Sequence, residues 1–541
     1  AAVILDETQG TLAEQMERAR QCASPLPLFV PSIPEQDAPV SAPERPTDLL
    51  FDNGIGGFSA DGREYVIHLG AEETTPTPWS NIHANDGFGC LVTEAGGGFT
   101  WAANSGENRI SPWTNDPVSD RPTEILYLRD EETAAIWSTT PAPAGRDAAC
   151  EIRHGAGYST WHKHAHGLEQ EQLVFVPTDA PVKIVRLRVR NLLDQHRRLT
   201  ATYYAEWLLG SLPSMARPHV RSGYDAGVQA LLARNYWNPD FADRCAFLTA
   251  SRKPHGFTTD RREFLGSEAD LARPDGLGRW GLSGEPSGGL DPCGVYQVHL
   301  DLAPGGSEEA IFVLGQGTDE AEALTLTKYW RDPLIVEQAL QDLHAHWDGI
   351  LGAVEVRTPD RAFDLMVNRW LVYQSLSSRV LARTGFYQAS GAIGFRDQLQ
   401  DVLALLYSEP ERVRAHILLC AEHQFEEGDV LHWWHPPSDR GVRTRCSDDL
   451  LWLPYAVSTY VSATGDVSIL HEPLRFLDAP PLAAGEEDRY ARFEHALARA
   501  PLIEHCERAL ERALVEGAHD LPLIGSGDWN DGMDRIGRAG R

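Results

Sequence analysis

Short alternating runs of hydrophobic and polar residues dominate the chain from residue 49 to about residue 317. Residues 182–189 (Val-Lys-Ile-Val-Arg-Leu-Arg-Val) alternate as a strand does, and residues 199–204 follow after a polar turn. Glycine-rich turns such as residues 94–98 separate further runs, and no helical period is sustained. Many short strands over this length predict a large antiparallel β-sandwich domain at 49–317.

Beyond residue 318 the hydrophobic period becomes that of helices. Asp319 and Glu322 mark the start of one helix and Asp332-Pro333 the start of a second, which predicts a helical linker at 318–355. From 356 to 541 we expect an all-α domain of amphipathic helices joined by polar loops. This succession fits an (α/α)6 barrel, and the helices present predict that the C-terminal part of the barrel is missing from this chain.

Three helices of this domain have recognisable signals in the sequence. Ser408 and Glu411 are spaced as a capping box for one helix, and a helix at 448–463 should stop at Gly465. Residues 502–514 form a third, amphipathic helix. Because an incomplete barrel leaves helix faces uncovered, we expect exposed apolar faces lined by Leu450, Leu453 and Leu502.

Residues 1–48 differ from the rest of the chain. Residues 11–21 predict a short helix, and residues 23–47 are rich in proline, serine and acidic side chains, as linkers are. An interdomain linker at this point predicts that the chain was cut from a longer protein.

Composition narrows the classes of partner. The 541 residues carry a net charge of −30, which argues against nucleic acid or an anionic membrane as a partner, since both would repel the chain. No apolar run reaches the ~18 residues of a membrane span, and we expect a cytoplasmic protein. Eight cysteines without metal-ligand spacing predict reduced thiols, and we expect no metal and no cofactor.

The loop at 525–533, Gly-Ser-Gly-Asp-Trp-Asn-Asp-Gly-Met, carries the most chemistry. Asp528 and Asp531 are carboxylates, and Trp529 offers a flat apolar face between them. A sugar ring needs this mixture, because its C–H faces stack on aromatic rings, and glycosidic cleavage needs an acid to protonate the leaving oxygen. The alternative is a surface loop with local turns and a tryptophan that packs in the core.

A second stretch, residues 386–401 (Phe-Tyr-Gln-Ala-Ser-Gly-Ala-Ile-Gly-Phe-Arg-Asp-Gln-Leu-Gln-Asp), combines glycines, aromatic rings and opposite charges in the same way. Together the two stretches resemble glycoside hydrolase family 94, the cellobiose and chitobiose phosphorylases. The strongest likeness is to the phosphorylase-like domain of cyclic β-1,2-glucan synthases. That likeness extends to Asn-Gly-Ile-Gly-Gly-Phe at 53–58, to residues 111–120 and to His-Trp-Trp-His-Pro-Pro at 432–437.

The resemblance implies a reaction and a general acid. Family members use inorganic phosphate as co-substrate, which attacks C1 of a β-glucoside with inversion and releases α-glucose 1-phosphate. The family's general acid falls on Asp531, and Trp529 would line the subsite of the sugar that is cut. Asp397 and Arg396 would hydrogen-bond that sugar, and Arg383 matches a sugar-binding arginine. The alternative for Arg396 and Asp397 is that they tie two helices together.

Substrate choice cannot be carried over from cellobiose, because the disaccharide phosphorylases have an additional arginine before Phe-Arg-Asp that residues 390–394 lack. Trp433 and Trp434, with the flanking histidines His432 and His435, are candidates to stack a longer glucan; aromatic core residues are the alternative. Two charged groups lie near the site or form salt bridges, namely the basic run Arg440, Arg443 and Arg445 and the acidic pair Asp448 and Asp449.

The implied partners are a β-glucan oligosaccharide and phosphate, with no nucleic acid. The family's phosphate-binding histidine and Thr-Gly pair lie C-terminal to the catalytic loop, so a C-terminal remainder of the barrel is expected to supply them. In the synthases an N-terminal membrane glycosyltransferase part precedes this domain, which would place the chain at the cytoplasmic face of the inner membrane; a homodimer is a further arrangement. An inverting hydrolase and a non-catalytic glucan-holding module stay as alternatives.

Overall fold

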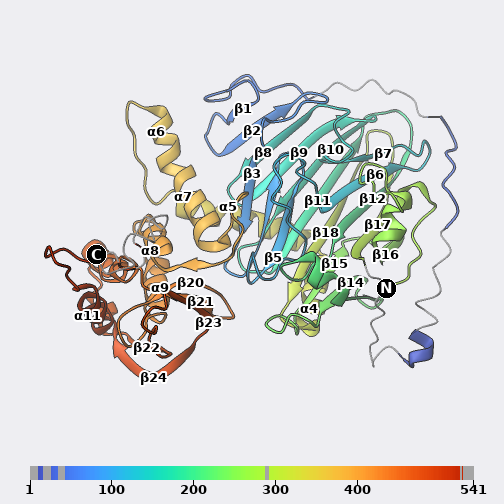
Figure 1. Ribbon diagram of the computed structural model, residues 1–541. Helices are drawn as coiled ribbons and strands as arrows, with labels where there is room; N and C mark the ends of the chain where they lie inside the picture. Colours follow the sequence, from blue (N-terminus) through green and yellow to red (C-terminus); the bar gives the residue numbers. More distant parts are fainter. Residues whose placement is uncertain are drawn as a thin grey trace. The chain divides into compact units, whose positions relative to one another are not determined.

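The computed structural model describes residues 10–15, 26–34, 43–286, 291–523, 525 and 527. Asp531, Trp529 and Asp528 therefore lie outside the described residues. The chain divides into two compact units, one of residues 1–347 with 385–389, and one of residues 348–384 with 390–541 (Figure 1).

Three antiparallel sheets build the first unit. Ten strands form the largest sheet, in the order β1 (Gly56–Phe58), β2 (Glu64–Leu69), β8 (Cys150–Gly155), β9 (Tyr158–Ala165), β10 (Leu168–Phe175), β11 (Val182–Asn191), β18 (Ser307–Gly317), β15 (Cys245–Ala250), β14 (Ala230–Asn235) and β13 (Val220–Asp225). Five strands form the second, in the order β16 (Gly256–Asp260), β17 (Pro292–Leu302), β12 (Arg197–Glu206), β6 (Glu124–Asp130) and β7 (Ile136–Ser138). The third consists of β3 (Ser80–Ala84), β4 (Phe88–Thr93) and β5 (Gly98–Ala102). The prediction of a large antiparallel domain is confirmed.

The alternation in β11 explains how these sheets share a core. Val185, Leu187 and Val189 are buried, whereas Arg188 and Arg190 are exposed on the other face. Buried residues of β12 and β17 join the same hydrophobic cluster, so apolar side chains from the ten-stranded and five-stranded sheets meet. Short helices lie in the connections of this unit, namely α2 (Pro213–Ala216), η2 (Arg217–His219), α3 (Arg261–Leu265) and η3 (Asp275–Gly278).

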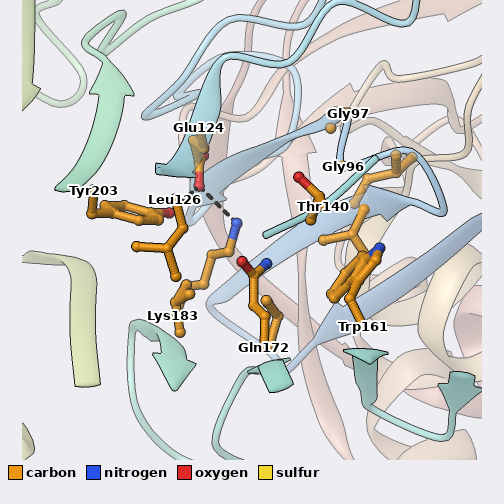
Figure 2. Close-up of a pocket in the computed structure, with 14 residues that line it drawn as sticks. Gly96, Gly97, Glu124, Leu126, Thr140, Trp161, Gln172, Lys183 and Tyr203 are labelled. Atoms are coloured by element: carbon orange, nitrogen blue, oxygen red, sulfur yellow. Dashed lines mark hydrogen bonds and ion pairs between the residues drawn. The ribbon is translucent and has the colours of Figure 1, made fainter. Parts of the chain in front are cut away.

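A small polar cavity of about 30 Å³ lies inside this unit (Figure 2). Lys183 and Glu124 line it as an ion pair 2.7 Å apart, and Tyr203 also donates a hydrogen bond to Glu124. Burial opposes both charges, yet the pair keeps the pKa of Lys183 raised and that of Glu124 lowered. The cavity has the size of one or two water molecules, so it is part of the core and not a sugar site.

Two helices follow the sheets, α4 (Glu320–Trp330) and α5 (Pro333–Leu351). The Asp319 side chain caps α4 by accepting a hydrogen bond from the backbone N–H of Glu322. Both helix starts agree with the sequence prediction. Within the described residues, no helix is long and apolar enough to cross a membrane.

The second unit is mainly helical. Residues 361–382 form one continuous helical stretch that changes between α and π geometry, and four α-helices follow it. These elements are α6 (Arg361–Leu365), η4 (Met366–Trp370), α7 (Leu371–Gln374), η5 (Ser375–Ala382), α8 (Phe395–Leu403), α9 (Pro410–Ala421), α10 (Trp452–Thr464) and α11 (Leu502–Ala513), with the 3₁₀ turns η6 (Asp449–Leu451) and η7 (Val467–His471). Helices α8, α9 and α11 pack around α10.

Two small sheets in this unit were not predicted from the sequence. The larger has the order β19 (Ile393–Gly394), β20 (Leu431–His435), β21 (Arg440–Thr444) and β23 (Asp488–Arg492), and the other pairs β22 (Pro473–Asp478) with β24 (Glu494–Pro501). The expectation of an all-α domain is therefore wrong for these segments, which form short antiparallel strands.

Two finer predictions for this unit are also wrong. The capping box at Ser408 and Glu411 is absent, because Glu409 is the N-cap of α9 and makes no side-chain capping bond. Leu450, Leu453 and Leu502 are buried, since α10 and α11 pack against each other and against η6. The exposed apolar side chains of α11 are instead Ile503 and Leu510.

Candidate active site

The loop that starts at Gly525 lies beside the segment that follows β21. The backbone N–H of Ser447 donates a 3.0 Å hydrogen bond to the carbonyl of Gly527, and Cys446 forms β-bridges with both glycines. Gly525 has φ +69°, and a Cβ there would lie 2.2 Å from the carbonyl oxygen of Arg445. Only glycine fits this position, so the backbone of the loop is fixed where it enters the site.

Arg396 lies in the first turn of α8 and is held by two acidic residues. Its Nη1 is 2.9 Å from Asp448 Oδ1, and its Nε is 3.6 Å from Asp449 Oδ1. The side chains of Arg396 and Asp449 are 4% and 2% exposed, so this pair is shielded from solvent. Arg396 therefore links α8 to the segment beside the loop.

Asp449 has a second partner on β20. His432 Nδ1 lies 2.7 Å from Asp449 Oδ2. Burial raises the pKa of Asp449, although His432 and Arg396 both favour its charged form. A chain of polar contacts thus runs from α8 through η6 to β20, entirely within the second unit.

Asp397 differs from its neighbour Arg396. Its side chain is half-buried and accepts no hydrogen bond from the residues that the structure describes. A Cβ at Gly394 would lie 2.2 Å from Asp397 Oδ2, so the carboxylate occupies the space that this glycine leaves. Asp397 therefore takes no part in the contacts that Arg396 makes, and its carboxylate can accept hydrogen bonds from a ligand.

Arg383 closes the helical stretch before this motif. It has φ +52°, and its Nε donates a 3.1 Å hydrogen bond to the carbonyl of Gly391. The backbone N–H of Gly391 donates in return to the carbonyl of Arg383, at 3.0 Å. These contacts fix the start of the segment that leads to β19 and α8.

The two tryptophans of β20 point to opposite faces of the sheet. Trp434 is fully buried, and its ring stacks on His423 with centroids 3.9 Å apart. For Trp434 the glucan-stacking prediction is wrong, because no face of the ring is open to a sugar. Trp433 is half-buried, and its ring centroid lies 5.7 Å from that of Tyr490 on β23, which is 56% exposed. Tyr490 was missed because no local signal links it to Trp433.

The basic run after β20 is structural for two of its three arginines. Arg443 is buried and binds both carboxylate oxygens of Asp429 at 2.7 Å. Arg445 donates to backbone carbonyls of residues 482, 483 and 486. The acidic pair after this basic run, Asp448 and Asp449, contacts Arg396 of the Phe-Arg-Asp motif.

Two family models match the sequence of this chain. Residues 63–333 match the supersandwich domain of glycosyl hydrolase 94, and residues 346–540 match the catalytic domain of the glycosyl hydrolase 94 superfamily. The chain belongs to glycoside hydrolase family 94. Both site motifs of this family 94 chain fall in the part matched to the catalytic domain.

Three curated relatives span much of this family 94 chain. It is 40% identical to the cyclic β-(1,2)-glucan synthase NdvB of Rhizobium meliloti over 98% of this chain and 19% of the relative. It is 28% identical to an N,N'-diacetylchitobiose phosphorylase of Vibrio furnissii, over 78% of this chain and 57% of the relative. It is 27% identical to a solabiose phosphorylase of Paenibacillus borealis, over 90% and 60%. The chain thus spans only part of each relative's length.

Proposed function

We propose that the chain phosphorolyses β-glucosides with inversion, using inorganic phosphate to release α-glucose 1-phosphate. The observation that carries the proposal is Asp397, an accessible carboxylate beside the fixed Arg396, in a domain where the loop of Asp531 enters along Cys446 and Ser447. Family membership and the phosphorylases among the relatives support the same reaction.

In this proposal Asp531 protonates the glycosidic oxygen while phosphate attacks C1 from the opposite face. No general base is needed, because phosphate is already anionic and nucleophilic. Asp397 accepts hydrogen bonds from the hydroxyls of the sugar that is cut, and Trp529 stacks against its ring. Arg383 and Arg396 hold the segments on either side of Gly394, and so position Asp397.

We further propose β-1,2-glucan as the substrate, supported by the 40% identity to a cyclic β-(1,2)-glucan synthase. A long glucan needs contacts beyond the sugar that is cut. Trp433 of β20 and Tyr490 of β23 lie side by side on one face of the same sheet. Their rings can stack against the C–H faces of further sugar rings.

The partners follow from the same proposal. We propose that a further segment completes an (α/α)6 barrel and contributes the phosphate-binding groups, with the exposed Ile503, Leu510 and Leu514 as part of its contact surface. In a synthase, an N-terminal membrane glycosyltransferase part would bring the chain to the cytoplasmic face of the membrane.

The test is to incubate the protein with β-1,2-glucan in the presence and absence of phosphate. Phosphate-dependent release of glucose 1-phosphate supports phosphorolysis. Phosphate-independent release of shorter glucans would instead indicate an inverting hydrolase. Glucan binding without any product would indicate a glucan-holding module. Asp531→Asn is the control, since any product from the site must disappear in that variant.

A further inference from the structure

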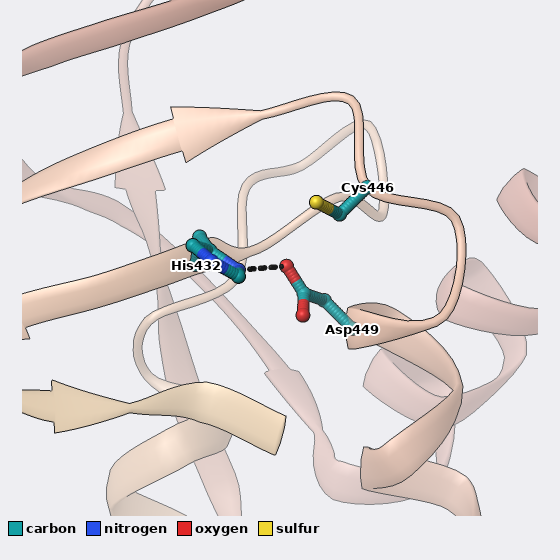
Figure 3. Close-up of side chains that lie close together, drawn as sticks. All are labelled: His432, Cys446 and Asp449. Atoms are coloured by element: carbon teal, nitrogen blue, oxygen red, sulfur yellow. Dashed lines mark hydrogen bonds and ion pairs between the residues drawn. The ribbon is translucent and has the colours of Figure 1, made fainter. Parts of the chain in front are cut away.

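Three side chains with different donor atoms converge in the second unit (Figure 3). They are His432 of β20, Cys446 after β21 and Asp449 of η6. The nitrogen, sulfur and oxygen atoms that they offer all lie within 4.8 Å of one another. Cys446 has no role in the proposed phosphorolysis, and the sequence shows no metal-ligand spacing here, because three separate segments supply the three groups.

This donor set suits a zinc-class ion. Imidazole, thiolate and carboxylate are the three ligand types that Zn²⁺ takes in proteins, and three protein ligands leave a fourth position for water or substrate. Bond lengths of about 2.0–2.3 Å place the ligands of a tetrahedral ion about 3.3–3.6 Å apart. His432 Nδ1 and Asp449 Oδ2 are 2.7 Å apart, so insertion of an ion requires them to separate by less than about 1 Å.

The charge of the surroundings also favours a cation. Among the residues that the structure describes, Asp448 and Asp449 face one guanidinium, that of Arg396, which leaves one negative charge. A Cys446 thiolate would add a second, and a divalent ion would neutralise both. The buried Asp449 carboxylate, only 2% exposed, would gain a stronger partner than a hydrogen bond.

We propose that His432, Cys446 and Asp449 form a binding site for Zn²⁺ or a similar divalent transition-metal ion. Binding releases the thiol proton of Cys446 to solvent, and the proton between His432 Nδ1 and Asp449 passes to Nε2 of His432, so that the imidazole coordinates through Nδ1 as the neutral ring. The ion draws Asp449 away from Arg396, and Cys446 adjoins the entry of the loop of Asp531. Resting on the proposed function, the consequence is that the bound ion inhibits phosphorolysis.

The binding test uses Co²⁺ as a spectroscopic substitute for Zn²⁺ in the full chain. One Co²⁺ per chain should produce a thiolate-to-cobalt charge-transfer band and the intense visible bands of a tetrahedral ion, and Zn²⁺ should remove both. Cys446→Ser should lose the charge-transfer band and bind at least about tenfold more weakly. His435→Gln is the matched control, a neighbouring histidine of β20 outside the cluster, and should bind as the unaltered chain does. No charge-transfer band, or a band that survives in Cys446→Ser, would overturn the site.

The activity test compares each variant with its own metal-free rate. Micromolar Zn²⁺ should slow phosphorolysis by the unaltered chain, a chelator should restore it, and Cys446→Ser should need at least about tenfold more Zn²⁺ for the same inhibition. Equal inhibition of both proteins would refute the assignment of inhibition to this site. A chain without any phosphorolysis refutes the proposed function alone, because the cobalt spectrum still decides whether the ion binds.

Discussion

At the scale of single residues, adjacent positions of α8 have different roles. Arg396 and Asp397 follow each other, so their side chains leave the helix about 100° apart. Arg396 turns to Asp448 and Asp449, whereas Asp397 occupies the space beside Gly394. Opposite charges next to each other suggested a pair, but helix geometry directs the two groups to different surroundings, and the Asp397 carboxylate keeps hydrogen-bonding capacity for a ligand.

We expect Asp531→Asn to abolish phosphorolysis and to leave glucan affinity nearly unchanged. An amide keeps the shape of the side chain but cannot donate the catalytic proton, and general acid catalysis contributes about 10²–10⁴-fold. Initial rates of glucose 1-phosphate release, with glucan affinity from calorimetry, measure both quantities. Normal turnover in Asp531→Asn together with loss in Asp528→Asn would assign the acid to the other aspartate.

Sugar affinity should fall in Asp397→Asn and in Trp529→Ala, for different reasons. The first loses hydrogen bonds to a charged group, worth about 1.5–3 kcal/mol, and the second loses stacking. Asp401→Asn is the matched control on the same helix, because Asp401 already pairs with Arg379 at 2.9 Å. Calorimetric titration with glucan should separate them; equal affinities in all three variants would remove Asp397 and Trp529 from the sugar site.

At the scale of elements, one strand places its tryptophans in two environments. Successive side chains of a strand point to opposite faces, so Trp434 enters the core when Trp433 faces outward. The register pairs Trp433 with Val442, and Val442 with Tyr490, which brings Trp433 and Tyr490 to the same face. The aromatic surface therefore depends on two strands far apart in the sequence, β20 and β23, which both pair with β21 between them.

Trp433→Ala and Tyr490→Ala should weaken binding of long glucans more than binding of short ones. Loss of one stacked ring costs about 1 kcal/mol, or roughly a fivefold change in affinity. Trp434→Ala should instead lower the free energy of unfolding by about 3–5 kcal/mol, because it leaves a cavity. Affinity as a function of glucan length and chemical denaturation measure the two effects. A length-independent loss in the Trp433 and Tyr490 variants would contradict the assigned surface.

Local signals predicted individual elements but not their pairing. The strand at 182–191 and the helix starts at Asp319 and Pro333 follow from alternation, capping and proline geometry, which involve few neighbouring residues. The sheet of β19, β20, β21 and β23, and the cluster of His432, Cys446 and Asp449, depend on long-range contacts that no local pattern encodes. The roles proposed for Asp531 and Asp397 come from the family resemblance, because composition alone does not indicate them.

At the scale of the whole molecule, the excess of acidic residues gives a net charge of −30. The pKa of each carboxyl depends on how deeply it is buried and on its neighbours. Glu124, for example, is buried beside a cation, Lys183. Glu94 is different: it is 3% exposed, and it accepts hydrogen bonds from Thr75 and from the backbone N–H of Trp79. Burial raises the pKa of Glu94 to about 7.

Glu94 should therefore make the first unit less stable as pH rises. Its folded pKa of about 7 exceeds the usual 4.5, so the native state binds more protons than the unfolded state between these values. The contribution of Glu94 to the free energy of unfolding is fully present below about pH 4.5. It decreases by a few kcal/mol in all as pH rises to about 7.

Glu94→Gln, which keeps an acceptor for Trp79 and has no charge to bury, should remove this contribution and raise the melting temperature at pH 8 relative to the unaltered chain. Calorimetric melts of both proteins from pH 5 to pH 8 give the difference. Parallel curves across that range would mean that Glu94 stays ionised in the fold.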